Sequence, residues 1–170
     1  MAKKWVLINL AWVLLTLSAC GWQLRDKPLL SDSLGTIHLS YHESQAGMAI
    51  EIERALKTNN VKLVDSVENA NYQLKIIDTK QSRRMSTLNS FARATQYQIF
   101  QTVDFIILDT MGKPIIPIST ASAESTYNFD ESDLLASQNE EIFLQSNLRS
   151  KIVRQIIRRL DEASNGLIGQ

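Results

Sequence analysis

The chain has 170 residues, and its 18 lysines and arginines balance 18 aspartates and glutamates to a formal net charge of zero. Without a basic surplus the chain lacks the electrostatic footprint of a nucleic-acid-binding protein, so that class is excluded. Its single cysteine excludes a disulfide framework, and its length suits one domain with its own core.

The first 20 residues have the layout of a bacterial lipoprotein signal. Two lysines precede the apolar run 5–17, and Leu17–Cys20 fits the lipobox pattern, in which the cysteine thiol is acylated. The run is shorter than the roughly 20 residues that cross a bilayer, which disfavours a spanning helix. A buried structural thiol is the other alternative. We expect Cys20 to carry covalent N-acyl and S-diacylglycerol groups, with no other cofactor.

The same segment predicts a location and a domain plan. Gly21 follows the cysteine, and the lack of an aspartate there favours the outer membrane of a Gram-negative cell over the inner one. The expected plan is a signal peptide at 1–19, an acylated tether at 20–35, a single domain at 36–162 and a short tail at 163–170.

The first half of the domain predicts strands around one helix. Alternating polarity over 36–41 indicates a half-buried strand. Apolar residues at helical spacing predict an amphipathic helix over 44–58. Two more strands are expected, a short one at 61–64 and a longer one at 72–80.

The second half predicts a long hairpin and one more strand. Residues 81–93 are polar and basic, which indicates the twisted end of a hairpin with a mobile tip. The clearest alternation indicates a strand over 96–108. A turn at 109–113 leads to a strand over 114–127. Because Pro117 cannot donate to a ladder, this strand is expected at an edge or with a bulge.

The final helix has the strongest signals. Ser137 and Glu140 form a capping box that predicts its start. Five apolar residues follow at intervals of four: Leu144, Leu148, Ile152, Ile156 and Leu160. An Asn-Gly pair at 165–166 is expected just after the helix. This order predicts the α+β class, with two helices packed on one face of a mixed four- to five-stranded sheet as a two-layer sandwich.

The sequence indicates no catalytic or metal-binding set. His38 and His42 need not share a face, since one lies in a predicted strand and the other in a turn. Glu140 and Glu141 are adjacent on a helix and so point about 100° apart; helix capping accounts for them. A phosphate-binding glycine loop, a nucleophile elbow and a Cys–His pair are absent from the sequence. We therefore expect no enzyme and no metal site.

Two basic groups are candidates for ligand contact. The first flanks the hairpin end and consists of Arg83, Arg84 and Arg93. Arginine binds phosphate and carboxylate through a bidentate fork, and the apolar residues between these arginines suit an amphiphile that carries phosphates beside acyl chains. The second group lies on one side of the last helix and consists of Lys151, Arg154 and Arg158. A solvated helix face is the simpler explanation of this second group.

The residues that follow the acylated cysteine resemble a known family. Cys-Gly-Trp-Gln-Leu-Arg at 20–25 is similar to the mature start of the LPS-assembly lipoproteins of the LptE family, also called rare lipoprotein B. The strand-helix opening and three later segments are similar to that family in the same order. These segments are Tyr97-Gln98, Pro117-Ile118-Ser119 and Asn139-Glu140. The resemblance covers essentially the whole mature chain.

The resemblance implies a non-enzymatic role in a fold of two helices and a mostly four-stranded sheet. Family members lie at the inner leaflet of the outer membrane, plug the lumen of the LptD β-barrel and help lipopolysaccharide reach the cell surface. Basic residues near the hairpin and near the start of the last helix are implied to bind lipopolysaccharide. Arg83, Arg84 and Arg93 are the candidates in the first region, whereas residues 136–138 hold no basic side chain.

A free-standing lipoprotein that binds lipid or acts as an adaptor is the alternative function. It predicts a stable monomer with a sizeable apolar cavity, for which a domain of this size leaves little room. A cell-wall enzyme, the third class, predicts titratable residues that converge in a pocket.

Overall fold

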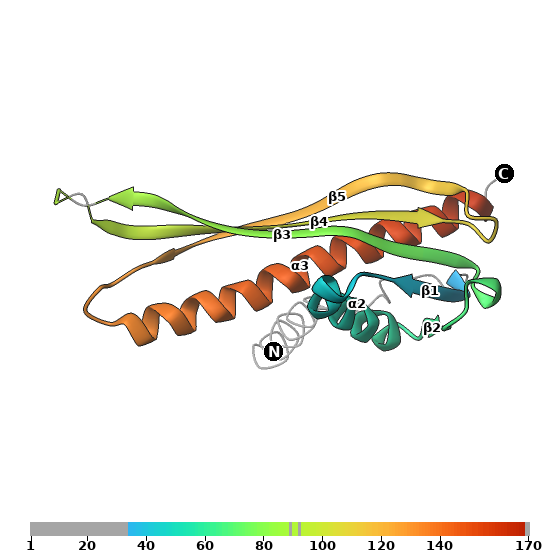
Figure 1. The fold of residues 1–170 in the computed structure, drawn as a ribbon, viewed down its shortest axis with the longest axis horizontal. Helices are drawn as coiled ribbons and strands as arrows, with labels where there is room; N and C mark the ends of the chain where they lie inside the picture. Colours follow the sequence, from blue (N-terminus) through green and yellow to red (C-terminus); the bar gives the residue numbers. More distant parts are fainter. Residues whose placement is uncertain (1–33, 89, 92, 169–170) are drawn as a thin grey trace, which may run out of the picture.

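One long helix and three long strands give the molecule an elongated shape (Figure 1). The computed structural model describes residues 34–88, 90–91 and 93–168. The expected signal peptide, the acylation site Cys20 and most of the expected tether therefore lie outside the described residues.

The described residues form five strands and two α-helices. The strands are β1 (Thr36–Ser40), β2 (Lys62–Leu63), β3 (Tyr72–Leu88), β4 (Ala94–Leu108) and β5 (Pro114–Asn128). The helices are α2 (Ala46–Thr58) and α3 (Leu134–Ile168), and two short 3-10 turns are η3 (Glu43–Gln45) and η4 (Val67–Asn69). In the sheet order β2-β1-β3-β4-β5, β1 is parallel to both neighbours and β3 to β5 form an antiparallel meander. The predicted α+β class with a mixed sheet is confirmed.

A single large core joins both helices to one face of the sheet. The predicted apolar stripe of α3 supplies Ile152, Ile156 and Leu160, and all three are fully buried. The partners on α2 and β4 are Ile52, Leu56, Val103, Phe105 and Ile107. Because strand side chains alternate between faces, the odd-numbered β4 residues point to the helices and the even-numbered ones point away.

β3 is longer than predicted. The sequence predicted a strand over 72–80 followed by the twisted end of a hairpin with a mobile tip over 81–93; the structure shows one strand that continues to Leu88 and remains paired with β4. Residues 81–88 show no alternation of apolar and polar side chains. Both faces of the strand are exposed there, so neither face requires apolar side chains. Backbone pairing with β4, which β5 supports from the other side, forms this part of the strand.

α3 begins earlier than the predicted capping box. The Oδ1 atom of Asp133 accepts a hydrogen bond from the Ala136 N–H at 3.1 Å, which is the contact expected of a residue that caps a helix. Ser137 is instead buried inside the first turn, where its Oγ accepts a hydrogen bond from the Asp130 N–H at 3.1 Å. The capping-box prediction was wrong because this serine binds the preceding loop.

The folded region extends past both predicted limits of 36–162. Leu34, expected to belong to the tether, is buried in the large core. α3 continues to Ile168, past the expected Asn-Gly stop, so most of the expected tail is helical. Ala163 and Ser164 are buried, and this packing outweighs the weak local preference to end the helix.

β5 is an edge strand with a bulge. Its pairing with β4 changes register between the pairs Phe105–Ser119 and Ile107–Ile116. Pro117 and Ile118 therefore lie opposite one β4 residue, which is the extra-residue pattern of a β-bulge. The edge position and the bulge predicted from Pro117 are both confirmed.

Two isoleucines of α3 form a matched pair for a stability test. Ile152 is fully buried, whereas the Ile142 side chain is largely exposed. We expect Ile152→Ala to lower the free energy of unfolding by about 2–5 kcal/mol, because it removes buried methylenes and leaves a cavity. Ile142→Ala should change it by less than about 0.5 kcal/mol. Urea denaturation measures both, and equal losses would contradict the described packing of α3.

Candidate functional site

The half of the molecule away from α2 has a small core of its own. This distal end comprises residues 82–88 and 93–100 of the hairpin, 123–129 of β5 and its continuation, and 134–148 of α3 (Figure 1). Its buried side chains are Ile99, Tyr127 and Leu148. The Tyr97 ring packs edge-on against Phe129, with ring centroids 5.1 Å apart. Only a few apolar side chains therefore hold the first half of α3 to the sheet.

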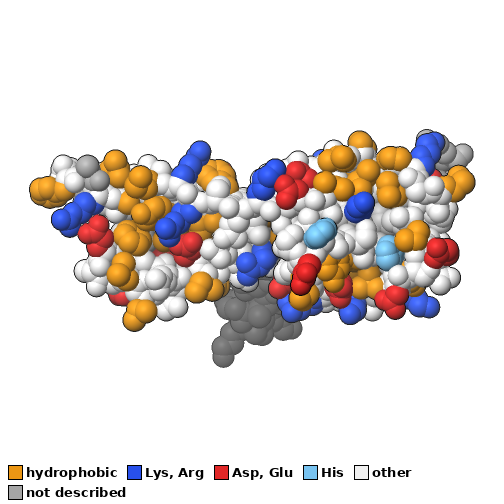
Figure 2. Space-filling view, viewed as in Figure 1, with side chains coloured by type: hydrophobic (Ala, Val, Ile, Leu, Met, Phe, Trp, Pro, Cys, Tyr) orange, Lys and Arg blue, Asp and Glu red, His pale blue; other side chains and the backbone are white. Residues whose placement is uncertain are grey.

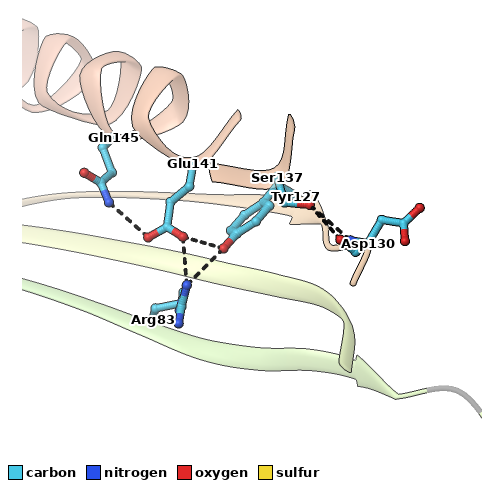
Figure 3. Close-up of polar contacts among 6 residues, drawn as sticks. All are labelled: Arg83, Tyr127, Asp130, Ser137, Glu141 and Gln145. Carbon is cyan, nitrogen blue, oxygen red and sulfur yellow. Dashed lines mark hydrogen bonds and ion pairs between the residues drawn. The ribbon is translucent and has the colours of Figure 1, made fainter. Parts of the chain in front are cut away.

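A polar cluster adds to this small core (Figure 3). Nη1 of Arg83, on β3, donates to Oε2 of Glu141, on α3, at 2.9 Å and lies 3.4 Å from the Tyr127 hydroxyl. That hydroxyl, on β5, donates to the same carboxylate oxygen at 2.5 Å. The Arg83 guanidinium also lies 4.6 Å from the centre of the Tyr97 ring. We call Arg83, Tyr127 and Glu141 the Arg83 clamp, since they link α3 to two strands.

The protonation states of the clamp are set by its surroundings. Burial, with the hydrogen bond to Glu141 adding to it, raises the pKa of Tyr127 to about 12, so the hydroxyl stays a donor. Burial also acts to raise the pKa of Glu141, but the hydrogen bonds from Tyr127 and Arg83 outweigh it and hold that pKa below its usual range. The clamp is therefore an ionised carboxylate between two donors, an arrangement suited to holding elements together rather than to transferring protons.

Arg84 points to the opposite face of the sheet from Arg83. Its Nη2 and Nε atoms donate to Oε1 of Gln98 at 2.9 and 3.1 Å. The guanidinium lies over the Phe100 ring, 4.2 Å from the ring centre. Because neither contact neutralises the positive charge, Arg84 presents a cation on the face of the sheet away from the helices.

Arg93 lies near the end of the hairpin and reaches the loop between β5 and α3. Its Nη1 pairs with Oε2 of Glu131, in the loop between β5 and α3, at 3.1 Å. The three arginines singled out in the sequence therefore share one end of the molecule but face three different surroundings. Two of them are paired with carboxylates from the segment that follows β5.

Sequence reasoning missed the role of Glu141. Helix capping appeared to explain it, because the predicted start of the helix lay only four residues earlier. With the helix beginning at Leu134, Glu141 lies on the same side as Leu144 and Leu148, the side that faces the sheet. Glu141 precedes Leu144 by three residues and Leu148 by seven, and this helical spacing would have marked the glutamate as facing inward.

The face of the meander away from the helices is polar. We call it the open face. It consists of the outward-pointing residues Asp78, Lys80, Ser82, Arg84, Gln96, Gln98, Phe100, Thr102, Asp104, Thr120, Ser122, Glu124, Thr126 and Asn128. Hydrogen bonds between strands connect several of them, including Thr120 Oγ1 to Asp104 at 2.5 Å and Gln96 Nε2 to Asn128 at 3.0 Å. The open face is thus a polar surface on which hydroxyl and amide groups alternate with charged side chains and one aromatic ring, that of Phe100.

Apolar side chains are also exposed at the distal end, as the orange groups at the left of Figure 2 show. Those on the hairpin and on the first half of α3 are Met85, Leu88, Phe91, Leu134, Leu135, Ile142 and Phe143. Within the part of the chain that the structure describes, no helix is long and apolar enough to cross a membrane. The same described residues hold no group of three or more potential metal ligands.

The clamp predicts an acid-dependent loss of stability. Because the folded-state pKa of Glu141 lies below its ordinary value of 4.5, the unfolded chain binds the proton more tightly. The contribution of Glu141 to the free energy of unfolding is therefore fully present above pH 4.5 and is lost as the pH falls through the folded-state pKa. Glu141→Gln should lack this pH-dependent contribution to the free energy of unfolding. Glu140→Gln, at the neighbouring residue, should keep it. Urea unfolding between pH 3 and 6 measures the difference, and identical profiles for Glu141→Gln and the unmodified protein would contradict it.

Comparison with known proteins matches this architecture. A family model described as LptE, lipopolysaccharide-assembly, matches residues 34–160. The LPS-assembly lipoprotein LptE of Pectobacterium atrosepticum is 22% identical over 149 residues, which are 87% of this chain and 79% of that protein.

Two solved structures share the fold. The uncharacterized lipoprotein B of Nitrosomonas europaea is 19% identical, with a TM-score of 0.71 over 83% of this chain and 90% of that one. The rare lipoprotein B of Shewanella oneidensis is also 19% identical, with a TM-score of 0.69 over 78% of this chain and 98% of that one. Because the family model covers most of the chain, including α2, the whole sheet and α3 as far as residue 160, the chain belongs to the LptE lipopolysaccharide-assembly family.

Proposed function

We propose that this protein is a non-enzymatic subunit of the lipopolysaccharide translocon, located in the lumen of an LptD-type outer-membrane β-barrel. Lipid on Cys20 anchors it at the inner leaflet of the outer membrane, where it supports assembly of the barrel and insertion of lipopolysaccharide at the cell surface. Membership of the LptE family and the name of its Pectobacterium relative support an assembly role. The acylation site rests on the lipobox of the sequence.

The open face is the observation that carries the barrel proposal. Lumen-facing side chains of outer-membrane barrels are polar, so a domain inside one needs a surface that hydrogen-bonds rather than one that is apolar. The open face offers hydroxyl, amide and charged groups from three strands, and neither helix covers it. An uncovered polar sheet face of this kind is suited to contact with a barrel wall.

The arginine candidates contribute unequally to lipopolysaccharide contact. Arg83 is held in the clamp, and Arg93 is paired with Glu131. Among the described residues, Arg84 contacts the Gln98 amide and the Phe100 ring, neither of which is charged, so its own charge remains available to a phosphate. The exposed apolar residues of the hairpin lie near it in sequence and suit the acyl part of an amphiphile. We therefore assign the main lipopolysaccharide contact at this end to Arg84.

Site-specific photo-crosslinking in outer membranes tests the barrel contact. A photoreactive amino acid at Thr126, exposed on the open face, should form a stoichiometric adduct with a large β-barrel protein. The same group at Thr58, exposed at the end of α2, is the matched control and should form less of this adduct. If no barrel protein is recovered at either position and the acylated protein is isolated alone, a free-standing lipid-binding role replaces the proposal.

Glutamine substitutions separate the arginines that bind ligand from those that stabilise the fold. Arg84→Gln should weaken lipopolysaccharide retention several-fold while leaving the thermal midpoint close to that of the unmodified protein. Arg83→Gln should lower the unfolding free energy by roughly 1 kcal/mol, because it removes charge-assisted hydrogen bonds in a half-exposed setting. Lipopolysaccharide pull-down and thermal unfolding of both variants provide the comparison. Unchanged retention in Arg84→Gln would contradict the assignment.

A further inference from the structure

The outer edge of β3 is covered in only one half of the molecule. β1 pairs with it at Tyr72–Lys75, and Nε2 of the buried Gln45 donates to the Ile77 carbonyl at 2.9 Å. Beyond Ile77, no other described strand pairs with this edge. Both β1 and α2 lie at one end of the molecule, whereas β3 continues to the other (Figure 1). The distal part of β3 is therefore paired on one side only.

The direction of the β3 backbone follows from the pairing within the meander. Both the N–H and the C=O of Ser122 bond to the Gln155 amide of α3, so they point away from β4. Thr102, opposite Ser122, then directs its own N–H and C=O to β3, where its partner is Lys80. These directions alternate along an antiparallel strand. The odd-numbered residues of β3 from 79 to 85 therefore direct their backbone groups outward.

Three of these residues have outward backbone groups that nothing in the described chain satisfies. The Thr79 N–H donates to the Asp78 carboxylate at 2.8 Å, which closes the edge at that point. No strand, turn or side chain of the described residues bonds to the outward N–H and C=O groups of Gln81, Arg83 and Met85. Pairing with β4 is regular from Asp78 to Met85, between two register shifts. We call the outward backbone of Gln81, Arg83 and Met85 the β3 free edge.

Exposed apolar side chains accompany the β3 free edge. Val153 lies on the side of α3 that shares the large core with α2. Leu135 and Ile142 lie about five and about three turns before it, so the helical period places them on the same side, and both are largely exposed. Met85 is exposed on the helix-facing side of β3, since its β4 partner Tyr97 packs in the distal core. The rows that β1 and α2 fill in one half are thus uncovered in the other.

The free edge defines its partner as an extended polypeptide. Backbone N–H and C=O groups repeat along a strand edge with a spacing that another extended backbone matches, and strand addition to such an edge is a known mode of peptide recognition. Side chains of an added strand alternate between the two faces of the sheet. One set would face the side of Met85 and Ile142, which suits apolar residues, and the other would lie beside Lys80 and Arg84 on the open face, which suits carboxylates.

The same charges disfavour a second copy of this chain as the partner. Antiparallel pairing about the middle of the edge would place Arg83 opposite Arg83, and like charges directly opposite destabilise a pair of strands. The other edge of the meander is less accessible, because Gln155 binds the β5 backbone at Ser122 and a bulge interrupts β5 at Pro117. We propose that a strand of another protein, with alternating apolar and acidic side chains, adds to the β3 free edge in the row that β1 begins. The pairing and contacts behind this inference are independent of the proposed function.

Peptide binding to the mature, acylated protein in detergent tests the β3 free edge. The probe is a peptide of alternating valine and glutamate, about seven residues long to match 79–85, and alternating valine and lysine is its control. The valine–glutamate peptide should bind about tenfold more tightly. It should also slow amide hydrogen exchange at Gln81, Arg83 and Met85, whose N–H groups it would engage. Absence of protection at these three amides with millimolar peptide would overturn the proposal.

Methylated peptides distinguish strand addition from other modes of binding. Only every second N–H of an added strand points to β3. N-methylation of one alternate set of residues in the valine–glutamate peptide should therefore abolish binding, whereas methylation of the other set should leave it within about threefold. Equal effects of the two methylated peptides would overturn the proposal.

A proline variant removes one outward donor from the edge. Proline is tolerated in an edge strand where the N–H faces solvent. Gln81→Pro should therefore keep a thermal midpoint within a few degrees of the unmodified protein and lose binding of the valine–glutamate peptide. Ser82→Pro, whose N–H points to β4, is the control for backbone direction and should lower the midpoint further. Unaltered peptide binding in Gln81→Pro would overturn the proposal.

A pair of isoleucine variants tests the α3 side of the surface without altering the strand. Ile142→Asp should weaken binding of the valine–glutamate peptide several-fold, because it places a charge where the valines would lie. Ile50→Asp, at a similarly exposed isoleucine of α2, should bind the peptide like the unmodified protein. Equal peptide binding by the two variants would overturn the assignment, whatever the stability of Gln81→Pro.

The identity of the partner and the proposed function are tested separately. Sedimentation of the unmodified protein should show a monomer; a dimer that Gln81→Pro dissociates would assign the edge to a second copy and overturn the proposal. Failure of the peptide to bind would remove this inference and leave the barrel proposal standing. Peptide binding without a barrel adduct at Thr126 would refute the proposed function and leave the assignment of the β3 free edge intact.

Discussion

The packing of α3 along the β3–β5 meander is the constraint on which the rest of the structure depends. One helix contributes Ile152, Ile156 and Leu160 to the large core and Leu148 to the distal one. Because the helix is straight and continuous across both, the strands beside it are held in line far beyond the region that α2 covers. The elongated shape and the face of the meander that neither helix covers both follow from this arrangement (Figure 1).

The distal end shows how polar groups supplement an apolar core that is too small to act alone. Three buried side chains hold helix to sheet there, and the Arg83 clamp adds a carboxylate between two donors. A partly buried charge is costly unless it is hydrogen-bonded, and the clamp supplies these hydrogen bonds to Glu141. Arg83 therefore stabilises the fold. Ligand contact is better suited to Arg84, whose charge is not paired with a carboxylate.

Much of the fold could be predicted from the sequence, because the elements with one buried face carry a clear period. The strand over 96–108 and the helical stripe through Ile152 are examples. Residues 81–88 could not be predicted, since a strand exposed on both faces has no polarity period. The start of α3 was misplaced because Ser137 matches a cap motif while its hydroxyl binds the loop before the helix. The candidate site was found only in part: its arginines were identified, but their separate directions were not.

The sequence by itself determined the α+β class, the bulge at Pro117 and the basic character of the hairpin, and its lipobox predicts the acylated Cys20. These properties depend on local spacing and on covalent chemistry, which neighbouring residues in the chain define. Only the tertiary structure decided that Arg83 meets Glu141, that Arg84 faces the other side of the sheet and contacts Gln98, and that Arg93 pairs with Glu131. Each of these joins residues many positions apart, so its geometry depends on strand register and on helix rotation, which no local pattern specifies.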